Sequence, residues 1–267
     1  MTPTRIIKIG GRVIEQPALL TEFLRDFARL EGPKLLVHGG GRNATQLAER
    51  LGLEATLIDG RRVTDDAMLE VVVMVYGGLL NKKMVSQLQS FQCNALGLTG
   101  ADLNCILATR RPAAPVDFGW VGDVQQVRAE ALHTLLQQNV VPVLSPLTHD
   151  GQGQLLNTNA DTIAARVAEG LAKIAPTELY YFFEKAGVLT DPNDEDSVVA
   201  ALSEEGYQQG RDAGSIVAGM VPKLDNGFAA LRGGVKKVYI GHHHTLLAVG
   251  THSFNGTQLC LSPPATP

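Results

Sequence analysis

The stretch that most constrains this chain is a short apolar strand that runs into three consecutive glycines and then into a helix. Residues 35–38 read Leu-Leu-Val-His, Gly39-Gly40-Gly41 follow, and residues 43–51 have a helical pattern. Because glycine has no side chain, the backbone N–H groups and the positive end of the helix can point at an anion. The G-x-x-x-x-G-K-[ST] loop is absent, and the three glycines lack G-x-G-x-x-G spacing. The pattern favours an anion-binding loop of another kind over a turn that uses glycine for conformation alone.

Strands alternate with helices along most of the chain, and this alternation predicts the fold class. We expect an α/β fold with a doubly wound, mainly parallel sheet sandwiched by helices. In such a sheet, ligands lie outside the carboxyl ends of the strands. The expected strands are residues 5–9, 34–38, 95–98, 104–108, 140–145, 179–183 and 237–240, with hairpins at 118–124 and 251–261. The expected helices are residues 19–30, 43–51, 65–92 with a break near Gly77-Gly78, 129–138, 162–171 and 224–231.

The pattern restarts after about Ala175, and no linker or repeat separates the two halves. We therefore predict one domain, residues 1–267, with a first lobe at 1–174 and a second lobe at 175–267. A net charge of -4 argues against nucleic-acid partners and against docking on anionic membranes. No run is long and apolar enough to span a bilayer, and no signal-peptide core precedes the first strand. With three widely spaced cysteines, these features predict a cytoplasmic protein with free thiols.

Three consecutive histidines, His242-His243-His244, raise the question of a metal site. We expect adjacent side chains to diverge, and no paired cysteine or carboxylate spacing accompanies the histidines. The sequence therefore favours a polar turn and predicts no metal ligands.

Two lysines occupy positions that are poor choices for structure alone. Lys8 lies in an apolar strand before Gly10-Gly11, where an unpaired buried ammonium is costly. Lys223 lies where a helix begins and opposes the helix dipole. Each is either a solvated surface residue or part of a polyanion site. Asp161, at another strand end rich in small residues, could hold both lysines, and such a set suits phosphoryl transfer, which needs positioning and neutralisation of charge.

The residues also carry a family resemblance, from Lys8 to about Val238. The order of the blocks resembles that of N-acetyl-L-glutamate kinases, which belong to the amino acid kinase family. The resemblance implies ATP-dependent phosphorylation of the γ-carboxylate of N-acetyl-L-glutamate in arginine biosynthesis. It also implies ATP with Mg²⁺ as co-substrate, no tightly bound cofactor, and a homodimer. The blocks that carry it are Lys8-Ile9-Gly10-Gly11, Val37-His38-Gly39-Gly40-Gly41, Gly60-Arg61-Arg62-Val63-Thr64-Asp65, Asn157-Thr158-Asn159-Ala160-Asp161 and Gly219-Met220-Val221-Pro222-Lys223.

The same resemblance implies roles for individual residues. Lys8 and Lys223 stabilise the transferring phosphoryl group and Asp161 orients both. The acyl-amino acid, expected on the first lobe, is bound by Gly40, Gly41, Arg62 and Asn157, with Arg62 holding the α-carboxylate. Magnesium is held mainly by ATP phosphates and water. The nucleotide, expected on the second lobe, is bound by Gly10, Gly11, Glu184, Gly187, Val188, Leu189, Ser215, Ile216 and Val217.

The chain departs from the family pattern in three places. Phe183-Glu184-Lys185-Ala186 replaces Thr/Ser-Asp-Val, which alters the expected nucleotide contacts, and Asp225-Asn226-Gly227 places a glycine inside a helix. Arg61 replaces an apolar residue beside the acyl group. Arg61 either points to solvent or grips a second carboxylate, and the latter makes N-succinyl-L-glutamate an alternative substrate. An alternative of another class is a catalytically silent regulatory member of the family, which the intact lysines and Asp161 oppose.

Overall fold

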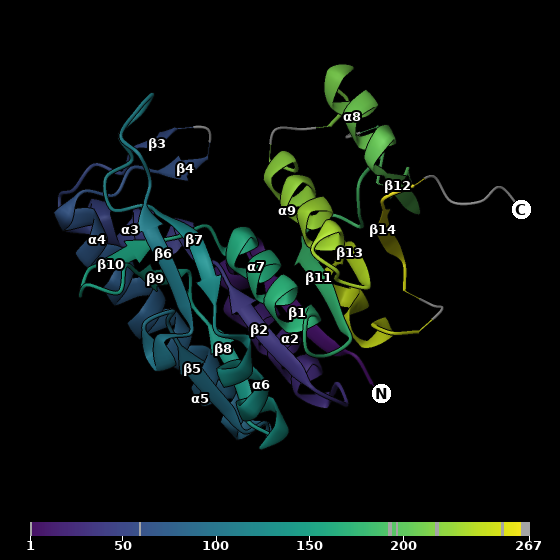
Figure 1. Ribbon diagram of the computed structural model, residues 1–267, viewed down its shortest axis with the longest axis horizontal. Helices are drawn as coiled ribbons and strands as arrows, with labels where there is room; N and C mark the ends of the chain where they lie inside the picture. The colour runs from purple at the N-terminus through teal and green to yellow at the C-terminus, as the bar shows by residue number, and fades with distance from the viewer. Residues whose placement is uncertain are drawn as a thin grey trace, which may run out of the picture.

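A computed structural model describes residues 2–58, 60–191, 194–195, 197–216, 219–251 and 254–262. Its centre is an eight-stranded sheet in the order β12-β14-β13-β11-β1-β2-β8-β5 (Figure 1). Neighbouring strands are parallel except for β13 and β14. The strands are β1 (Thr4–Ile9), β2 (Lys34–His38), β5 (Ala95–Leu98), β8 (Val141–Leu144), β11 (Thr177–Phe183), β12 (Ala201–Ser203), β13 (Lys237–His242) and β14 (Gly256–Cys260).

Helices cover both faces of the sheet, so its central strands are apolar on both sides. Alternate residues of β1 and β11 enter different cores: Ile7 and Phe182 pack on one face, and Ile6 and Tyr181 on the other. Helices α6, α7 and α9 lie in front of the sheet in Figure 1, and α2 lies behind it. The helices are α1 (Arg12–Glu15), α2 (Pro17–Arg29), α3 (Gly41–Arg50), α4 (Asp66–Val72), α5 (Asn81–Ser90), α6 (Ala129–Gln137), α7 (Ala160–Ala172), α8 (Glu204–Asp212) and α9 (Val221–Arg232).

Smaller sheets flank the glycine-rich turn. One has four strands in the order β10-β9-β6-β7, and the other is the β3-β4 hairpin. Their strands are β3 (Leu57–Ile58), β4 (Arg61–Arg62), β6 (Ile106–Arg110), β7 (Gly122–Val127), β9 (Leu147–His149) and β10 (Leu155–Asn157). No helix in the described part of the chain is long and apolar enough to cross a membrane.

The predicted break in the helix over 65–92 is wrong. A π-helix, η1 (Val73–Leu80), joins α4 to α5 without interruption and contains both Gly77 and Gly78. A Cβ atom on Gly77 would lie 3.2 Å from Leu147 Cδ1, so glycine here allows close packing against β9. The glycines therefore mark a wider helical turn and a close contact, and the chain continues as a helix.

Other element predictions were partly wrong. Residues 118–124 form no hairpin, because β7 begins at Gly122 and pairs with β6. The expected strand at 104–108 begins at Ile106, after the 3₁₀ turn η2 (Asp102–Asn104). In the described part of 251–261 the strand is β14, which pairs with β13 and β12 instead of forming a hairpin within that range. Strands β3, β4 and β12 and helices α1 and α8 were not predicted. The remaining predicted strands and helices are confirmed within a few residues at each end.

Candidate functional site

Three charged side chains meet at the carboxyl end of the sheet. Asp161 Oδ1 lies 2.6 Å from Lys8 Nζ, and Asp161 Oδ2 lies 3.3 Å from Lys223 Nζ. Lys8 comes from the end of β1, Asp161 from the first turn of α7, and Lys223 from the first turn of α9. One carboxylate thus holds two ammonium groups whose residues are 215 positions apart in the sequence. One of these residues lies on the first strand and the other on the last α-helix.

The local structure fixes the carboxylate. Asn159 is the N-cap of α7, and its side chain accepts the backbone N–H groups of Asp161 (2.8 Å) and Thr162 (3.1 Å). The Tyr181 hydroxyl on β11 donates to the Asp161 carbonyl at 3.0 Å. A carboxylate in the first turn also lies at the positive end of the helix dipole. Hydrogen bonds within the protein therefore preorganise Asp161 before any ligand binds.

Burial and charge act against each other in this cluster. Burial alone raises the pKa of Asp161, but the ammonium groups of Lys8 and Lys223 outweigh it and lower that pKa below its usual value. Burial lowers the pKa of Lys8, and the charge of Asp161 partly restores it. Asp161 is therefore ionised at neutral pH. Lys8 and Lys223 both face Asp161, and Glu184 lies near enough to act on the charge of Lys8 as well.

The glycine-rich turn adopts a conformation that only glycine tolerates. Gly40 has a φ of 151° and is the N-cap of α3, with no side-chain cap hydrogen bond. A Cβ atom there would lie 2.4 Å from Leu80 Cδ1 and 3.2 Å from the Tyr76 ring. At Gly41 a Cβ atom would meet nothing within 4 Å. The first backbone N–H groups of α3, which have no partners within the helix, thus remain open to an anion.

Arg62 is buried against the start of α3. Its Nη2 donates to the Gly41 carbonyl (2.8 Å) and to Thr45 Oγ1 (2.7 Å), and its Nη1 lies 3.7 Å from Met68 Sδ. The Tyr76 side chain is a further hydrogen-bond partner of this guanidinium. These contacts fix the plane of the Arg62 guanidinium at the cavity wall. The Asn157 side chain is positioned in a similar way, because its Nδ2 donates to Thr64 Oγ1 at 3.0 Å.

A first cavity, of about 260 Å³, lies in front of these residues. Its lining includes Lys8, Asp161 and the glycine-rich turn, together with Arg61, Arg62 and Asn157. Arg111 and Asp123 also line this cavity, and the sequence analysis did not predict them as site residues. Arg111 Nε donates to both Asp123 carboxylate oxygens, at 3.1 and 3.2 Å. Four cationic side chains and two carboxylates line this cavity, so it suits an anion.

A second cavity, of about 280 Å³, is lined in part by Lys223 of the charged cluster. Glu184, Lys185 and Lys223 supply charge to its lining, while Phe183, Val188 and Met220 are among its apolar side chains. An apolar wall beside a lysine suits a ligand with a flat ring at one end and phosphates at the other. Asp161 lines the first cavity and Lys223 the second, so their ion pair connects the two.

The residues proposed to bind nucleotide fall into three groups. Six of them line the second cavity: Glu184, Gly187, Val188, Leu189, Ser215 and Ile216. Gly10 and Gly11 line the first cavity instead, where a Cβ atom on Gly10 would lie 2.9 Å from Lys8 Nζ. Val217 lies outside the described residues.

Two glycines near the second cavity have a packing role that sequence alone does not reveal. A Cβ atom on Gly187 would lie 2.6 Å from Thr257 Oγ1, and one on Gly227 would lie 2.5 Å from Leu259 Cδ1. Both glycines therefore let neighbouring backbone approach β14. The glycine within α9, which is costly for an isolated helix, is required here for packing.

Comparisons with known proteins agree with this geometry. The model of the amino acid kinase family matches residues 3–242. The chain is 52% identical over 235 residues to an acetylglutamate kinase of Phocaeicola vulgatus, covering 88% of this chain and 91% of that protein. It is 49% identical over 254 residues to an acetylglutamate kinase of Bacteroides fragilis, covering 95% of each.

A solved structure of N-acetylglutamate synthase from Neisseria gonorrhoeae, complexed with coenzyme A and N-acetyl-glutamate, has a similar fold. The TM-score is 0.81 at 23% identity, and the match covers 97% of this chain and 60% of that longer one. The family model covers most of the chain, and the relatives are matched over nearly their whole length. The chain therefore belongs to the amino acid kinase family.

Proposed function

We propose that this protein is an acetylglutamate kinase, which uses ATP to phosphorylate the γ-carboxylate of N-acetyl-L-glutamate in arginine biosynthesis. The observation that carries this proposal is Asp161, which pairs with Lys8 in the first cavity and with Lys223 in the second. Two cavities that meet at two lysines suit an acceptor and a phosphoryl donor placed end to end. The relatives at about half identity, which carry the name acetylglutamate kinase, support the same acceptor.

The reaction needs positioning and charge neutralisation more than acid–base chemistry. A γ-carboxylate is ionised at neutral pH, so one of its oxygens can attack the γ-phosphorus of ATP without a general base. The new oxygen–phosphorus bond forms as the bond to the β-phosphate oxygen breaks, and ADP leaves with that electron pair. Lys8 and Lys223 neutralise the negative charge on the phosphoryl oxygens during transfer. Asp161 acts as a positioning residue that holds both lysines.

We assign the acyl-amino acid to the lobe at 1–174 and the nucleotide to the lobe at 175–267. This division is supported by the two cavities, because the first is lined by residues between Lys8 and Thr162 and the second by residues between Phe183 and Lys223. Within the first lobe, the fixed guanidinium of Arg62 suits the α-carboxylate, and Gly40, Gly41 and Asn157 suit the rest of the amino acid.

Magnesium is expected to accompany ATP. Glu184 is the one carboxylate among the described residues that line the second cavity, and Asp161 is already paired with two lysines. These residues fit an ion held mostly by nucleotide phosphates and water, which is the usual mode for Mg²⁺. When bound, the ion neutralises phosphate charge.

The function is tested by measuring ADP release by the full chain with ATP and Mg²⁺. We expect sustained turnover with N-acetyl-L-glutamate and none with free L-glutamate above the background of ATP hydrolysis. A hydroxylamine trap for the acyl phosphate confirms that the phosphoryl group reaches a carboxylate. Nucleotide binding without turnover for any N-acylglutamate would contradict the proposal and favour the silent regulatory member.

Arg61 supports a second candidate function, in which the acyl group carries a carboxylate of its own, as in N-succinyl-L-glutamate. Arg61 lines the first cavity and has no ion-pair partner among the described residues, whereas Lys8 and Arg111 are paired. With Arg62 assigned to the α-carboxylate and Lys8 to the transferring phosphoryl group, Arg61 is the cation left for a further carboxylate.

The acyl group is decided by comparing the two substrates in the native chain and in Arg61→Leu. If Arg61 holds a succinyl carboxylate, the kcat/KM of the native chain is higher for N-succinyl-L-glutamate than for N-acetyl-L-glutamate. Arg61→Leu should then lower the succinyl-to-acetyl ratio of kcat/KM by roughly tenfold or more, because a charge-assisted contact of about 1.5–3 kcal/mol is lost. An unchanged ratio places Arg61 in solvent and leaves N-acetyl-L-glutamate as the substrate. The exposed Arg50→Leu on α3 is the matched control.

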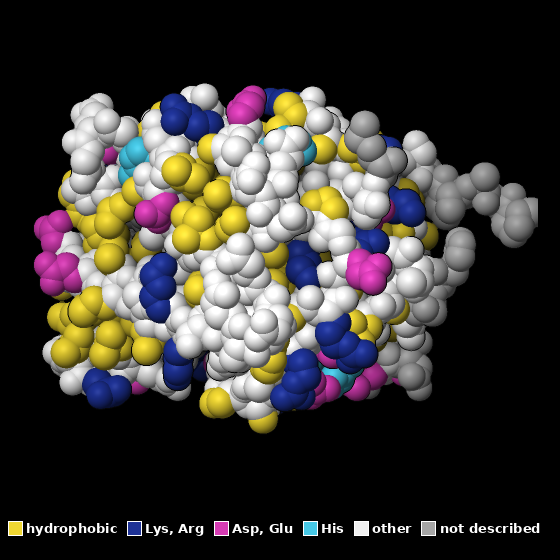
Figure 2. Space-filling view, turned by 90° about the horizontal axis from the view of Figure 1, so that it is seen from below, with side chains coloured by type: hydrophobic (Ala, Val, Ile, Leu, Met, Phe, Trp, Pro, Cys, Tyr) yellow, Lys and Arg dark blue, Asp and Glu magenta, His cyan; other side chains and the backbone are white. Residues whose placement is uncertain are grey.

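We further propose a homodimer that works in the cytoplasm. Figure 2 shows hydrophobic side chains gathered at the left end of the molecule, the end that carries α3, α4 and β10 in Figure 1. Met74 and Leu79 on η1 are 49% and 54% exposed, and Leu96 lies exposed on the edge strand β5. Light scattering should give twice the 28.5 kDa chain mass, and a mass near 28.5 kDa would contradict the dimer.

The proposal of a cytoplasmic location is supported by the cysteines. Cys93, Cys105 and Cys260 are free thiols, which suits a reducing compartment, and cell fractionation tests this location.

A further inference from the structure

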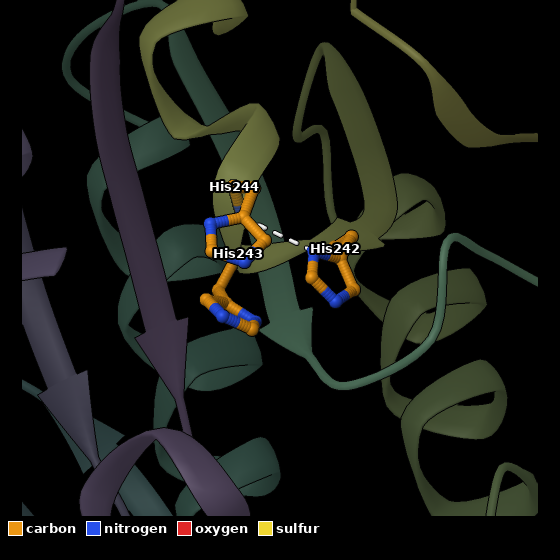
Figure 3. Close-up of side chains that lie close together, drawn as sticks. All are labelled: His242, His243 and His244. Carbon is orange, nitrogen blue, oxygen red and sulfur yellow. Dashed lines mark hydrogen bonds between the residues drawn. The ribbon is translucent and has the colours of Figure 1, made fainter. Parts of the chain in front are cut away.

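The three consecutive histidines converge, contrary to the expectation that adjacent side chains diverge (Figure 3). One ring nitrogen from each of His242, His243 and His244 lies within 4.8 Å of the other two. The ring centroids are separated by 4.1 Å for His242 and His243, 4.8 Å for His242 and His244, and 4.1 Å for His243 and His244. None of the three is among the described residues that line either cavity.

A change of backbone conformation explains the convergence. His242 ends β13 with extended backbone (φ -75°, ψ 141°), and the 3₁₀ helix η3 (His243–Ala248) begins at the next residue. In a continuous strand, consecutive side chains point to opposite faces. Because the chain changes from strand to 3₁₀ helix within this triplet, the alternation stops and the three rings lie over the same corner.

His243 is already arranged as a metal ligand. It is buried, and its Nδ1 lies 3.2 Å from the Phe183 carbonyl oxygen on β11. When Nδ1–H donates to that carbonyl, the lone pair is on Nε2. This Nε2 is buried and has no hydrogen-bond partner among the described residues. Metal-binding histidines typically use one nitrogen for the metal and donate the other N–H to a carbonyl or carboxylate. A buried nitrogen without a partner is otherwise unfavourable.

Carboxylates surround the cluster and favour a cation. Glu22 Oε1 on α2 lies 3.8 Å from His244 Nδ1, on the side opposite to Nε2 of that ring. Glu184 lies near enough to act electrostatically on both His242 and His243, and Glu195 acts on His242. If His244 binds through Nε2, its Nδ1–H faces Glu22, which repeats the carboxylate–histidine–metal arrangement.

We propose that His242, His243 and His244 bind a single divalent transition-metal ion of the zinc class, with water completing the coordination and Glu22 supporting His244 from its Nδ1 side. Imidazole nitrogens are preferred ligands of zinc, copper and nickel, whereas Mg²⁺ prefers oxygen. In a tetrahedral zinc site with Zn–N of about 2.0–2.1 Å, ligand nitrogens lie about 3.3 Å apart. The three nitrogens, now within 4.8 Å of one another, must therefore move closer, and we expect rotation of the His242 and His244 side chains to supply this movement.

His242 requires the largest adjustment. Its Nδ1 accepts the backbone N–H of His244 at 3.3 Å, the contact drawn as a dashed line in Figure 3. Binding through Nε2 moves the proton to Nδ1 and breaks this long hydrogen bond. The N–H group lies in the first turn of η3 beside the exposed His244, where water can replace the lost acceptor. The ion would then join β13 and η3 to the end of β11, at the residue where the second cavity begins.

Zinc titration of the full chain tests this site, with reducing agent present and ATP and Mg²⁺ absent. Calorimetry should show one zinc ion per chain. At a free zinc concentration 100 times the Kd, we expect the thermal midpoint to rise by about 5–10 °C. We expect His242→Gln, His243→Gln and His244→Gln each to weaken zinc binding by roughly tenfold or more, since the loss of a supporting partner alone costs about 10–100-fold.

The controls separate the site from incidental binding. His133→Gln on α6 removes a half-buried imidazole far along the chain from the cluster and should bind zinc as the native protein does. His244 has a side chain that is 55% exposed, so His244→Gln tests the proposal even if His243→Gln fails to fold. The proposal is overturned if the native chain takes up no zinc, or if the triple glutamine variant binds zinc as tightly as the native chain.

Discussion

Lys8→Met is expected to lower kcat by about 10²–10³, the usual cost of removing one preorganised donor to a transition state. Methionine keeps most of the side-chain volume and removes the ammonium that lies 2.6 Å from Asp161. The lost interaction is strongest when charge develops on the transferring phosphoryl group, so KM for the acylglutamate should change little. Initial rates of ADP release at saturating ATP measure both parameters.

Lys8→Met also leaves the buried Asp161 carboxylate with Lys223 as its one paired cation among the residues that the structure describes. Stability must therefore be followed together with activity. Breaking a buried ion pair from one side typically costs about 3–5 kcal/mol. The assay temperature is therefore set below the thermal midpoint of the variant. Lys237→Met, on an exposed position of β13, is the matched control and should keep native kcat. If Lys8→Met folds and keeps native kcat, Lys8 has no catalytic role.

Gly40→Ala is expected to destabilise the protein by about 2–4 kcal/mol, from backbone strain and overpacking together. The φ of 151° at Gly40 is unfavourable for any residue with a Cβ atom. The added carbon would also lie 2.4 Å from Leu80 Cδ1, inside η1. In thermal unfolding the midpoint should fall by roughly 5–15 °C, at about 2–4 °C per kcal/mol.

The next residue provides a control that differs only in its surroundings. A Cβ atom at Gly41 would meet nothing within 4 Å, and Gly41 is the first residue of α3. Gly41→Ala should therefore leave the midpoint unchanged or raise it slightly, because alanine favours helix more than glycine does. Equal thermal midpoints for Gly40→Ala and Gly41→Ala would contradict this prediction. They would show that residue 40 can adopt another backbone conformation and that packing against η1 does not fix the glycine-rich turn.

The cluster of Lys8, Asp161 and Lys223 could be predicted because each lysine occupies an unfavourable position. A lysine in an apolar strand and a lysine at a helix start both require a compensating charge, and this requirement is visible in a single sequence. Asp161, at the end of a strand rich in small residues, was the natural partner. The structure brings the three together, and their roles in catalysis stay predictions until the variants are measured.

Arg111 and Asp123 could not be found in the same way. They reach the cavity because β6 and β7 pair as an antiparallel ribbon, with Arg110 opposite Gly122. Arg110 and Arg111 are adjacent and chemically identical, and only tertiary pairing decides which of them enters the cavity. The π-helix η1 was missed for a related reason, because a widened turn has no distinct hydrophobic period and its glycines resemble a break.

The histidine triplet shows a limit of reasoning from one element at a time. The expectation of divergent side chains is correct for a strand, and β13 is a strand as far as His242. The change to a 3₁₀ helix at His243 could not be inferred from the local residues. A junction between two kinds of backbone is where side-chain direction is least predictable from sequence.

The central sheet has a mechanical consequence for the catalytic cycle. Strands β1 and β11 stay in parallel register from Thr4 with Thr177 to Ile9 with Phe182, and they join the half of the chain that carries the first cavity to the half that carries the second. Rotating one half on a flexible hinge would break these hydrogen bonds. Reactants are therefore expected to be brought together by elastic twisting of one continuous sheet, with larger displacements confined to segments beyond the strand ends. In such a molecule the stiffness of the sheet sets the distance between Lys8 and Lys223 when no ligand is bound. The sheet is expected to return to this untwisted shape after each turnover.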